Sequence, residues 1–156
     1  MAQADVERTL KNGAALGCTE ALFTFGERPE EEPGFSAMLA PLGYATILLR
    51  GEKGREALEI LFRARQALAT RIRPPSVEAR LLTLTGRAQI LEGHAEEARG
   101  SLRQATQREG VPAEAYFFLG ETLSGVNSPE SRAAYERYLA LEPTGPYADR
   151  ARRAIQ

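Results

Sequence analysis

Two glycines, Gly86 and Gly120, stand 34 residues apart, and a similar order of small and large side chains surrounds each of them. A repeat of this length is typical of a supersecondary unit of two helices, which cannot bury its apolar face alone. Such units pack on their neighbours and form an extended stack with a concave surface. The period therefore predicts stacked helical hairpins and a surface suited to binding, and it does not identify the ligand.

Hydrophobic periodicity supports two hairpins in the carboxy-terminal half. Leu81, Leu84 and Ala88 recur at helical spacing within a first helix that Glu92-Gly93-His94 ends, and 95–108 forms a second amphipathic helix. After Gly110-Val111-Pro112 the plan repeats, with helices predicted over 113–123 and from Ser128 to Glu142-Pro143. In each hairpin a glycine of the first helix is expected to make a hole for a large side chain of the second.

These residues resemble the tetratricopeptide repeat family, whose pattern alternates small and large residues in this order. The last full unit offers Tyr116, Leu119, Gly120, Leu123, Ser131, Tyr135 and Pro143. The preceding unit offers Leu82, Gly86, Gly93, Ala98, Leu102 and Ala105, and it departs from the pattern at Thr85, Gln89 and Gly110. An earlier unit is weaker, with Leu39, Leu42, Gly43 and Ala45 in its first helix and Ala57, Leu61 and Ala64 in its second.

The resemblance implies an all-α fold, a right-handed superhelical stack of antiparallel helix pairs. We expect the chain to divide into a degenerate amino-terminal hairpin with an acidic linker (1–34), a repeat with an extended second helix (35–75), two repeats (76–111 and 112–144) and a capping helix (145–156). The extended helix is expected to run from about Arg55 to Arg71. A final helix with one apolar and one polar face is what an array needs to cover its last apolar face.

Charge and cysteine content restrict the environment and the partners. The formal net charge of −1 gives no positive field of the kind that gathers nucleic acid or anionic lipid. The single cysteine, Cys18, has no intramolecular disulfide partner, and no segment has the length and apolarity of a membrane span. We therefore expect a cytoplasmic protein without membrane insertion or nucleic-acid binding, and the strong preference for arginine over lysine suggests a bacterium with a GC-rich genome.

No catalytic constellation is evident in the sequence. The only histidine, His94, lies in a turn and is expected to be exposed, and Gly51-Glu52-Lys53-Gly54 lacks the pattern of a phosphate-binding loop. The acidic run Glu30 to Glu32 is most simply a solvated loop, because acid–base catalysis needs a desolvated pocket. The sequence thus predicts no enzyme activity, no catalytic residue, no metal and no cofactor.

In arrays similar to this one, the first helix of each pair lines the concave groove. The side chains of those helices that are not used in packing are therefore the predicted partner-binding groove: Tyr44, Ile47, Leu48, Arg80, Thr83, Leu84, Arg87, Leu91, Glu114, Phe117, Phe118 and Glu121. We expect at least one of the two phenylalanines to be open to the groove. The polar clamp that some members of the family use for a terminal carboxylate is disfavoured, since Pro41, Leu84 and Phe118 stand where its asparagines would project.

The predicted function is that of a bacterial adaptor or scaffold. Aromatic and aliphatic anchors with arginine suit a protein or peptide that carries apolar residues and an acid, bound within a multiprotein assembly. The alternative is a structural module of a larger repeat protein that forms a homodimer through Phe23, Phe25 or Phe35.

Overall fold

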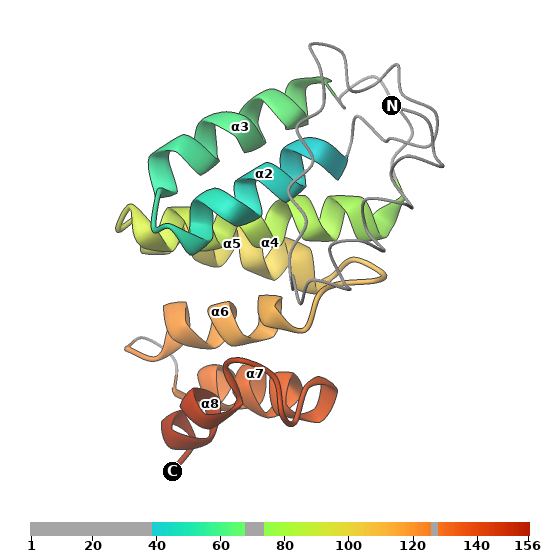
Figure 1. Ribbon diagram of the computed structural model, residues 1–156. Helices are drawn as coiled ribbons and strands as arrows, with labels where there is room; N and C mark the ends of the chain where they lie inside the picture. The colour runs from blue at the N-terminus through green and yellow to red at the C-terminus, as the bar shows by residue number, and fades with distance from the viewer. Residues whose placement is uncertain (1–38, 68–73, 126–127) are drawn as a thin grey trace, which may run out of the picture. The chain divides into compact units, whose positions relative to one another are not determined.

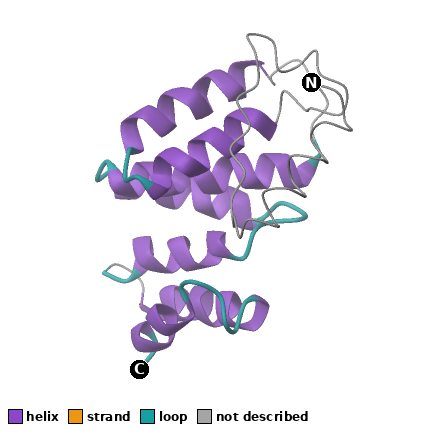
Figure 2. Cartoon of the chain, viewed as in Figure 1, coloured by secondary structure: helices purple, strands orange, loops and turns teal. Residues whose placement is uncertain are grey.

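A computed structural model describes residues 39–67, 74–125 and 128–156, nearly all of which belong to one compact unit, Pro41–Gln156. The account below concerns this unit (Figure 1). Its described residues form seven α-helices and no strand: α2 (Leu39–Arg50), α3 (Gly54–Ala67), α4 (Pro75–Leu91), α5 (Ala95–Thr106), α6 (Glu114–Leu123), α7 (Ser128–Leu141) and α8 (Ala148–Ala154). The all-α prediction is confirmed for this part of the chain (Figure 2).

Helices α4 and α5 form an antiparallel hairpin around Gly86. A Cβ atom placed on Gly86 would lie 2.5 Å from Cγ of Leu102, so only glycine leaves room for this leucine. Nearer the turn that connects the two helices, Ser101 Oγ donates a hydrogen bond of 2.8 Å to Oε1 of Gln89. Since later residues of α4 meet earlier residues of α5, the two helices run in opposite directions. The predicted hole at Gly86 is confirmed.

The second glycine has the same role in the hairpin of α6 and α7. A Cβ atom on Gly120 would lie 2.8 Å from Cε1 of Tyr135, and Ser131 Oγ donates a buried hydrogen bond of 2.9 Å to the Gly120 carbonyl. Gly43 differs, because no atom of the described residues lies within 4 Å of a Cβ built there. Among the described hairpins, the close approach that the repeat pattern predicts is therefore found at Gly86 and Gly120 and not at Gly43.

Consecutive helices also pack between hairpins, α3 on α4 and α5 on α6, and α4 contacts α6. One buried cluster joins α2, α3 and α4 through residues such as Leu42, Leu61 and Leu84. Another joins α6, α7 and α8 around Phe117 and Tyr138. The apolar core therefore runs from one hairpin into the next.

The turns at the ends of α2 and α4 share one backbone geometry. After α4, Gly93 has a φ of 81° and donates to the Ile90 carbonyl, while the amide of His94 donates to the Gln89 carbonyl at 2.8 Å. After α2, the corresponding left-handed residue is Glu52, with a φ of 57°. Glycine adopts this conformation without steric cost, whereas glutamate does not. The turn after α2 is closed nonetheless, with the Lys53 amide bonded to the Leu48 carbonyl at 2.9 Å.

Helix α8 covers the carboxy-terminal end of the second cluster. Its Ala148 and Ala151 are buried, and Tyr147 and Ile155 pack against the same cluster. The opposite face, with Asp149, Arg150, Arg152 and Arg153, is exposed. The helix therefore has one apolar and one charged side, as its sequence pattern predicts.

Several predictions lie outside the described residues. These are the amino-terminal hairpin and acidic linker of 1–34, the stretch 68–73 in which the extended second helix was expected to end, Cys18, and the phenylalanines of the alternative dimer, Phe23, Phe25 and Phe35. Among the helices that the structure does describe, none combines the length and the apolar character needed to cross a bilayer.

The packing at Gly86 predicts opposite effects for one substitution at two glycines. Gly86→Ala forces the added methyl group against Leu102 and should lower the free energy of unfolding by about 1–3 kcal/mol. Gly100→Ala, in α5, meets no atom within 4 Å and should raise it by about 0.5–1 kcal/mol through helix propensity. Urea unfolding followed by circular dichroism measures both. Equal stabilisation by the two alanines would contradict the packing role of Gly86.

Candidate binding site

Helix α4 presents a narrow face to α5 and a broader face to its other neighbours. Gly86 faces α5, while Leu84 and Ala88 belong to the core shared with α2 and α3. Because each residue of an α-helix is rotated by about 100° from the previous one, Arg87 and Leu91 point within about 60° of Leu84 and at least about 100° away from Gly86. Both residues line a pocket.

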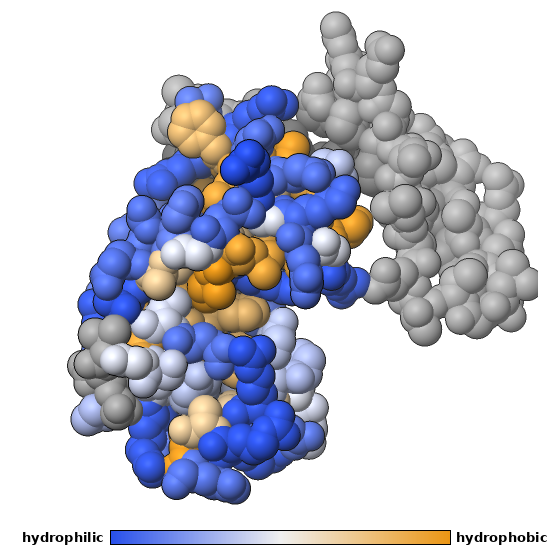
Figure 3. All heavy atoms as spheres, turned by 90° about the vertical axis from the view of Figure 1, so that its left-hand side faces the viewer, coloured by the Kyte–Doolittle hydropathy of each residue, from blue (hydrophilic) through white to orange (hydrophobic). Residues whose placement is uncertain are grey.

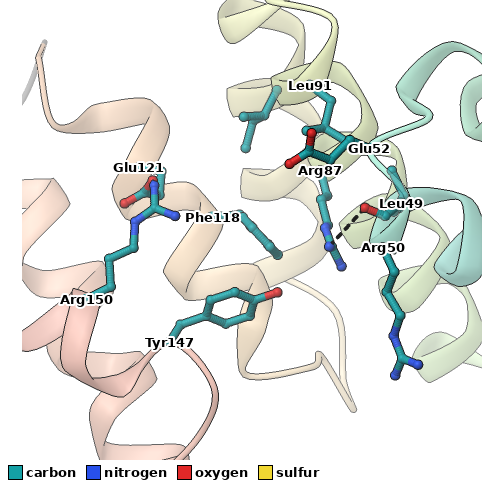
Figure 4. A pocket seen from close by; sticks show the side chains of 10 residues that line it. Leu49, Arg50, Glu52, Arg87, Leu91, Phe118, Glu121, Tyr147 and Arg150 are labelled. Atoms are coloured by element: carbon teal, nitrogen blue, oxygen red, sulfur yellow. Dashed lines mark hydrogen bonds and ion pairs between the residues drawn. The ribbon is translucent and has the colours of Figure 1, made fainter.

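The pocket has a volume of about 280 Å³ and is built from four separate parts of the chain. Its walls come from the end of α2 with the turn that follows, from α4, from α6 and from the region of α8 (Figure 4). The lining residues are Leu49, Arg50, Glu52, Arg87, Ile90, Leu91, Phe118, Glu121, Tyr147 and Arg150. The site is therefore a product of the stacking of three hairpins and the final helix.

Arg87 is held at the pocket by two contacts. Its Nη2 donates a hydrogen bond of 3.2 Å to the Leu49 carbonyl, and its guanidinium carbon lies 5.4 Å from the centre of the Phe118 ring. A cation above an aromatic face is stabilised by the ring quadrupole. No carboxylate of the described residues forms an ion pair with Arg87. This half-buried charge is thus positioned but not neutralised by direct pairing.

Glu121 occupies the position one repeat after Arg87, and its carboxylate has partners within the chain. Its carboxylate forms an ion pair with Arg150 and accepts a hydrogen bond of 2.8 Å from the Tyr135 hydroxyl. Burial, together with this bond to Glu121, raises the pKa of Tyr135. Arg150 also lies 5.5 Å above the Phe117 ring. Glu121 therefore connects α6, α7 and α8 at the edge of the pocket.

An aromatic cluster supports the floor of the pocket. The rings of Phe117 and Tyr147 stack with centres 4.4 Å apart and an interplanar angle of 12°, and Phe118 meets Phe117 edge to face at 5.4 Å. The Tyr147 amide donates a hydrogen bond of 3.0 Å to the Tyr138 hydroxyl, whose pKa is raised by burial. These contacts direct the Tyr147 hydroxyl into the pocket, toward Arg87 (Figure 4).

Exposed apolar side chains occur on the same helices that form the pocket. Leu91, the last residue of α4, is 41% exposed, and on α2 Tyr44 and Ile47 are 52% and 48% exposed. On the side of the unit where α2 and α4 end, a space-filling view shows an apolar area bordered by hydrophilic surface (Figure 3). An apolar area within a charged surround is typical of a binding surface.

The structure separates the twelve predicted groove residues into three groups. Four line the pocket: Arg87, Leu91, Phe118 and Glu121. Four others are at least partly accessible without lining it: Tyr44, Ile47, Arg80 and Glu114. The remaining four are buried: Leu48, Thr83, Leu84 and Phe117.

For the buried group the expected access to a groove is wrong, and of the two phenylalanines Phe117 is enclosed while Phe118 is mostly buried. Phe117 is 0% exposed and Phe118 8%. The physical reason is that a first helix packs on more than its own hairpin partner: Leu48 and Leu84 share a core with α3, and Phe117 is enclosed by α7 and α8. Phe118 still reaches the pocket wall.

Sequence reasoning missed the other lining residues, which are Leu49, Arg50, Glu52, Ile90, Tyr147 and Arg150. Glu52 belongs to a turn, and Tyr147 and Arg150 belong to a segment that was expected only to cap the stack. A signal was present in the pattern of α8, where an aromatic residue and an arginine flank the apolar face. In the described residues, no group of three or more His, Cys, Asp or Glu side chains is placed to hold a metal ion.

No protein-family model matches the chain. Over 48 residues, 31% of this chain, it is 67% identical to 7,8-didemethyl-8-hydroxy-5-deazariboflavin synthase of Methanoculleus marisnigri and 62% identical to the protein of the same name in Methanosphaerula palustris. Over 44 residues, 28% of this chain, it is 66% identical to the corresponding protein of Methanoregula boonei. The matches cover 14%, 15% and 13% of these curated relatives, so the chain spans about one seventh of their length.

These relatives correct one prediction. The chain was expected not to be an enzyme, but the proteins that share a segment with it at 62–67% identity are named as a synthase. That prediction relied on the absence of a catalytic motif within the sequence. A segment of an enzyme can lack such a motif, because catalytic residues are distributed over a whole fold. The relatives come from archaea, whereas arginine preference had suggested a bacterial source.

Glu114, on the first turn of α6, provides a test of the electrostatics near Arg87. Burial raises the pKa of this carboxyl more than Arg87 lowers it. The folded state therefore retains a proton that the unfolded chain loses above its ordinary pKa, and stability decreases as the pH rises through that window. Glu114→Gln mimics the protonated form and should raise the Tm at pH 7, with no difference at about pH 4 and below.

Thermal unfolding at the two pH values measures this effect. The exposed Glu136→Gln on α7 is the matched control and should change the Tm little at either pH. A lower Tm of Glu114→Gln at pH 7 would mean that attraction to Arg87 outweighs burial.

Proposed function

We propose that the unit Pro41–Gln156 is a tetratricopeptide-like module, a right-handed stack of antiparallel helix pairs, that binds a segment of a partner protein at the pocket described above. The 34-residue spacing of Gly86 and Gly120 and the matching contacts with Leu102 and Tyr135 support the repeat. In this proposal the module is a cytoplasmic scaffold within a larger assembly, and the pocket is the part of its surface that selects the partner.

The observation that carries the proposal is the composition of the pocket. It brings together two aromatic rings, three arginines and the exposed Leu91, from four separate parts of the chain. Aromatic residues and arginine dominate binding energy at protein interfaces, especially in partly enclosed pockets. A volume of about 280 Å³ lies just below the range of about 300–1,000 Å³ typical of small-molecule sites. It suits one or two side chains of a peptide better than a large cofactor.

A matched pair of leucines tests the site. Leu91 and Leu141 are each the last residue of a helix, α4 and α7, and are 41% and 45% exposed, but only Leu91 lines the pocket. Peptides selected on the whole chain from a random display library should bind Leu91→Ser about tenfold more weakly or worse, because an apolar anchor is lost. Their affinity for Leu141→Ser should equal that for the original protein. Isothermal titration calorimetry with the selected peptides measures all three affinities.

Two results would contradict the proposal. One is a library that yields no binding peptide, and the other is a set of peptides that tolerate Leu91→Ser while losing affinity for Leu141→Ser. In either case the pocket would not be the site of peptide binding.

The shared segment favours a second candidate function, which is a contribution to the formation of 7,8-didemethyl-8-hydroxy-5-deazariboflavin. The 67% identity over 48 residues is specific, yet it represents only 14% of the relative from Methanoculleus marisnigri. We therefore propose that the chain would act together with other proteins in this synthesis rather than supply a whole active site.

The second candidate is tested by adding the purified chain to an extract of its own organism and measuring the product named above by mass spectrometry. Faster formation of the product with the native chain, and not with heat-unfolded chain, would support the role. An unchanged rate would contradict it.

A further inference from the structure

We propose that the pocket selects a peptide with an acidic side chain, Asp or Glu, which binds Arg87 beside Tyr147 while a neighbouring apolar residue of the peptide packs on Leu91. The inference rests on the proposed function and specifies the chemistry of its ligand. The occupant is a segment of a partner protein, and recognition depends on one charge and one apolar contact.

The first argument is the state of Arg87. A guanidinium carries five N–H donors, and the described structure uses Arg87 for one hydrogen bond, to the neutral carbonyl of Leu49. Partial burial strengthens electrostatic interactions relative to those in water. Since Arg87 has no carboxylate within ion-pair distance among the described residues, an incoming carboxylate would gain a charge-assisted bond at little cost in reorganisation.

The second argument is preorganisation. The Phe118 ring and the Leu49 carbonyl fix the guanidinium from two sides. Tyr147 is fixed by stacking of its ring on Phe117 and by the hydrogen bond from its backbone amide to the Tyr138 hydroxyl. In the close-up, the Arg87 guanidinium and the Tyr147 hydroxyl point toward the same part of the pocket (Figure 4). Two fixed donors that converge suit the two oxygens of a carboxylate.

The charges of the other residues that line the pocket agree with an acidic ligand. Glu121 is paired with Arg150 and bonded to Tyr135, so it presents little free negative charge to the pocket. Glu52 also lines the pocket but is exposed, where solvent screens its charge. Half-buried Arg87 therefore has the stronger influence on which charge the pocket accepts.

The apolar part of the ligand follows from Leu91. This side chain lines the same pocket, lies one helical turn after Arg87 on α4 and is exposed. A peptide whose acidic residue meets Arg87 would place an adjacent residue within reach of Leu91. An acidic and apolar pair in the partner is the expected motif.

A double-mutant cycle tests the inference. The probes are synthetic peptides selected by display on the whole chain, each with a version in which its Asp or Glu is replaced by Asn or Gln. With the original protein, the amide version should bind about tenfold more weakly or worse, as expected for loss of a charge-assisted hydrogen bond. With Arg87→Met, both versions should bind with the same weak affinity, within about twofold.

Two further variants separate recognition from stability. Arg137 also lies above a ring, that of Tyr116 at 5.9 Å, but outside the pocket, so Arg137→Met should retain the tenfold preference for the acidic peptide. Tyr147→Phe removes only the hydroxyl and should reduce the preference by about twofold to tenfold, the effect of one hydrogen bond. Thermal unfolding is measured for each variant to check that it is folded. If Arg87→Met is unstable, Tyr147→Phe still tests the site.

Each outcome decides one of the two proposals. Selected peptides that depend on Leu91 but lack an acidic residue, or an acidic preference that survives Arg87→Met, would overturn the acidic ligand and leave peptide binding intact. Peptides that do not depend on Leu91 would overturn the proposed function itself. If the unliganded chain dimerises and Leu91→Ser makes it monomeric in analytical ultracentrifugation, a second copy occupies the pocket, and the acidic ligand is overturned.

Discussion

The close approach of helices at two glycines is the contact on which the described unit depends. At Gly86 the missing side chain admits Leu102, and at Gly120 it admits the ring of Tyr135. Both contacts align the two helices of a hairpin, and both therefore set which faces of the first helix remain for its other neighbours. Arg87 and Glu121 follow these glycines directly in sequence, so the packing that fixes the hairpins also turns both charges toward the pocket.

The same alignment explains why equivalent positions of two repeats have different roles. Leu84 and Phe118 are separated by one period, and both are buried, but Leu84 belongs to the aliphatic core with α2 and α3 whereas Phe118 meets an aromatic cluster. Arg87 and Glu121 differ in the same way. Glu121 is neutralised by Arg150 from the last helix, while Arg87 is held by a carbonyl and a ring. The pocket is asymmetric because these two equivalent positions have different partners.

Helix α8 and the residue before it thus contribute both to the core and to the pocket. Ala148 and Ala151 cover the end of the core, and Tyr147 and Arg150 extend from the same short segment to the pocket. In repeat arrays, a terminal helix with a polar outer face is needed for solubility. Here its position next to α6 also completes a site that the hairpins alone would leave open on one side. A segment of the chain is similar in sequence to archaeal proteins that are named as a synthase.

The amino-acid sequence by itself determined the helices, their pairing and the two glycine holes, because periodicity and residue size are local properties that a fixed spacing makes visible. Among the residues singled out from the sequence, Arg87, Leu91, Phe118 and Glu121 line the pocket. Only the tertiary structure decided that Phe117, Leu48 and Leu84 are buried, and that Glu52, Tyr147 and Arg150 join the pocket. Burial depends on which neighbours a helix meets on each side, and those neighbours come from distant parts of the chain whose approach no local pattern records.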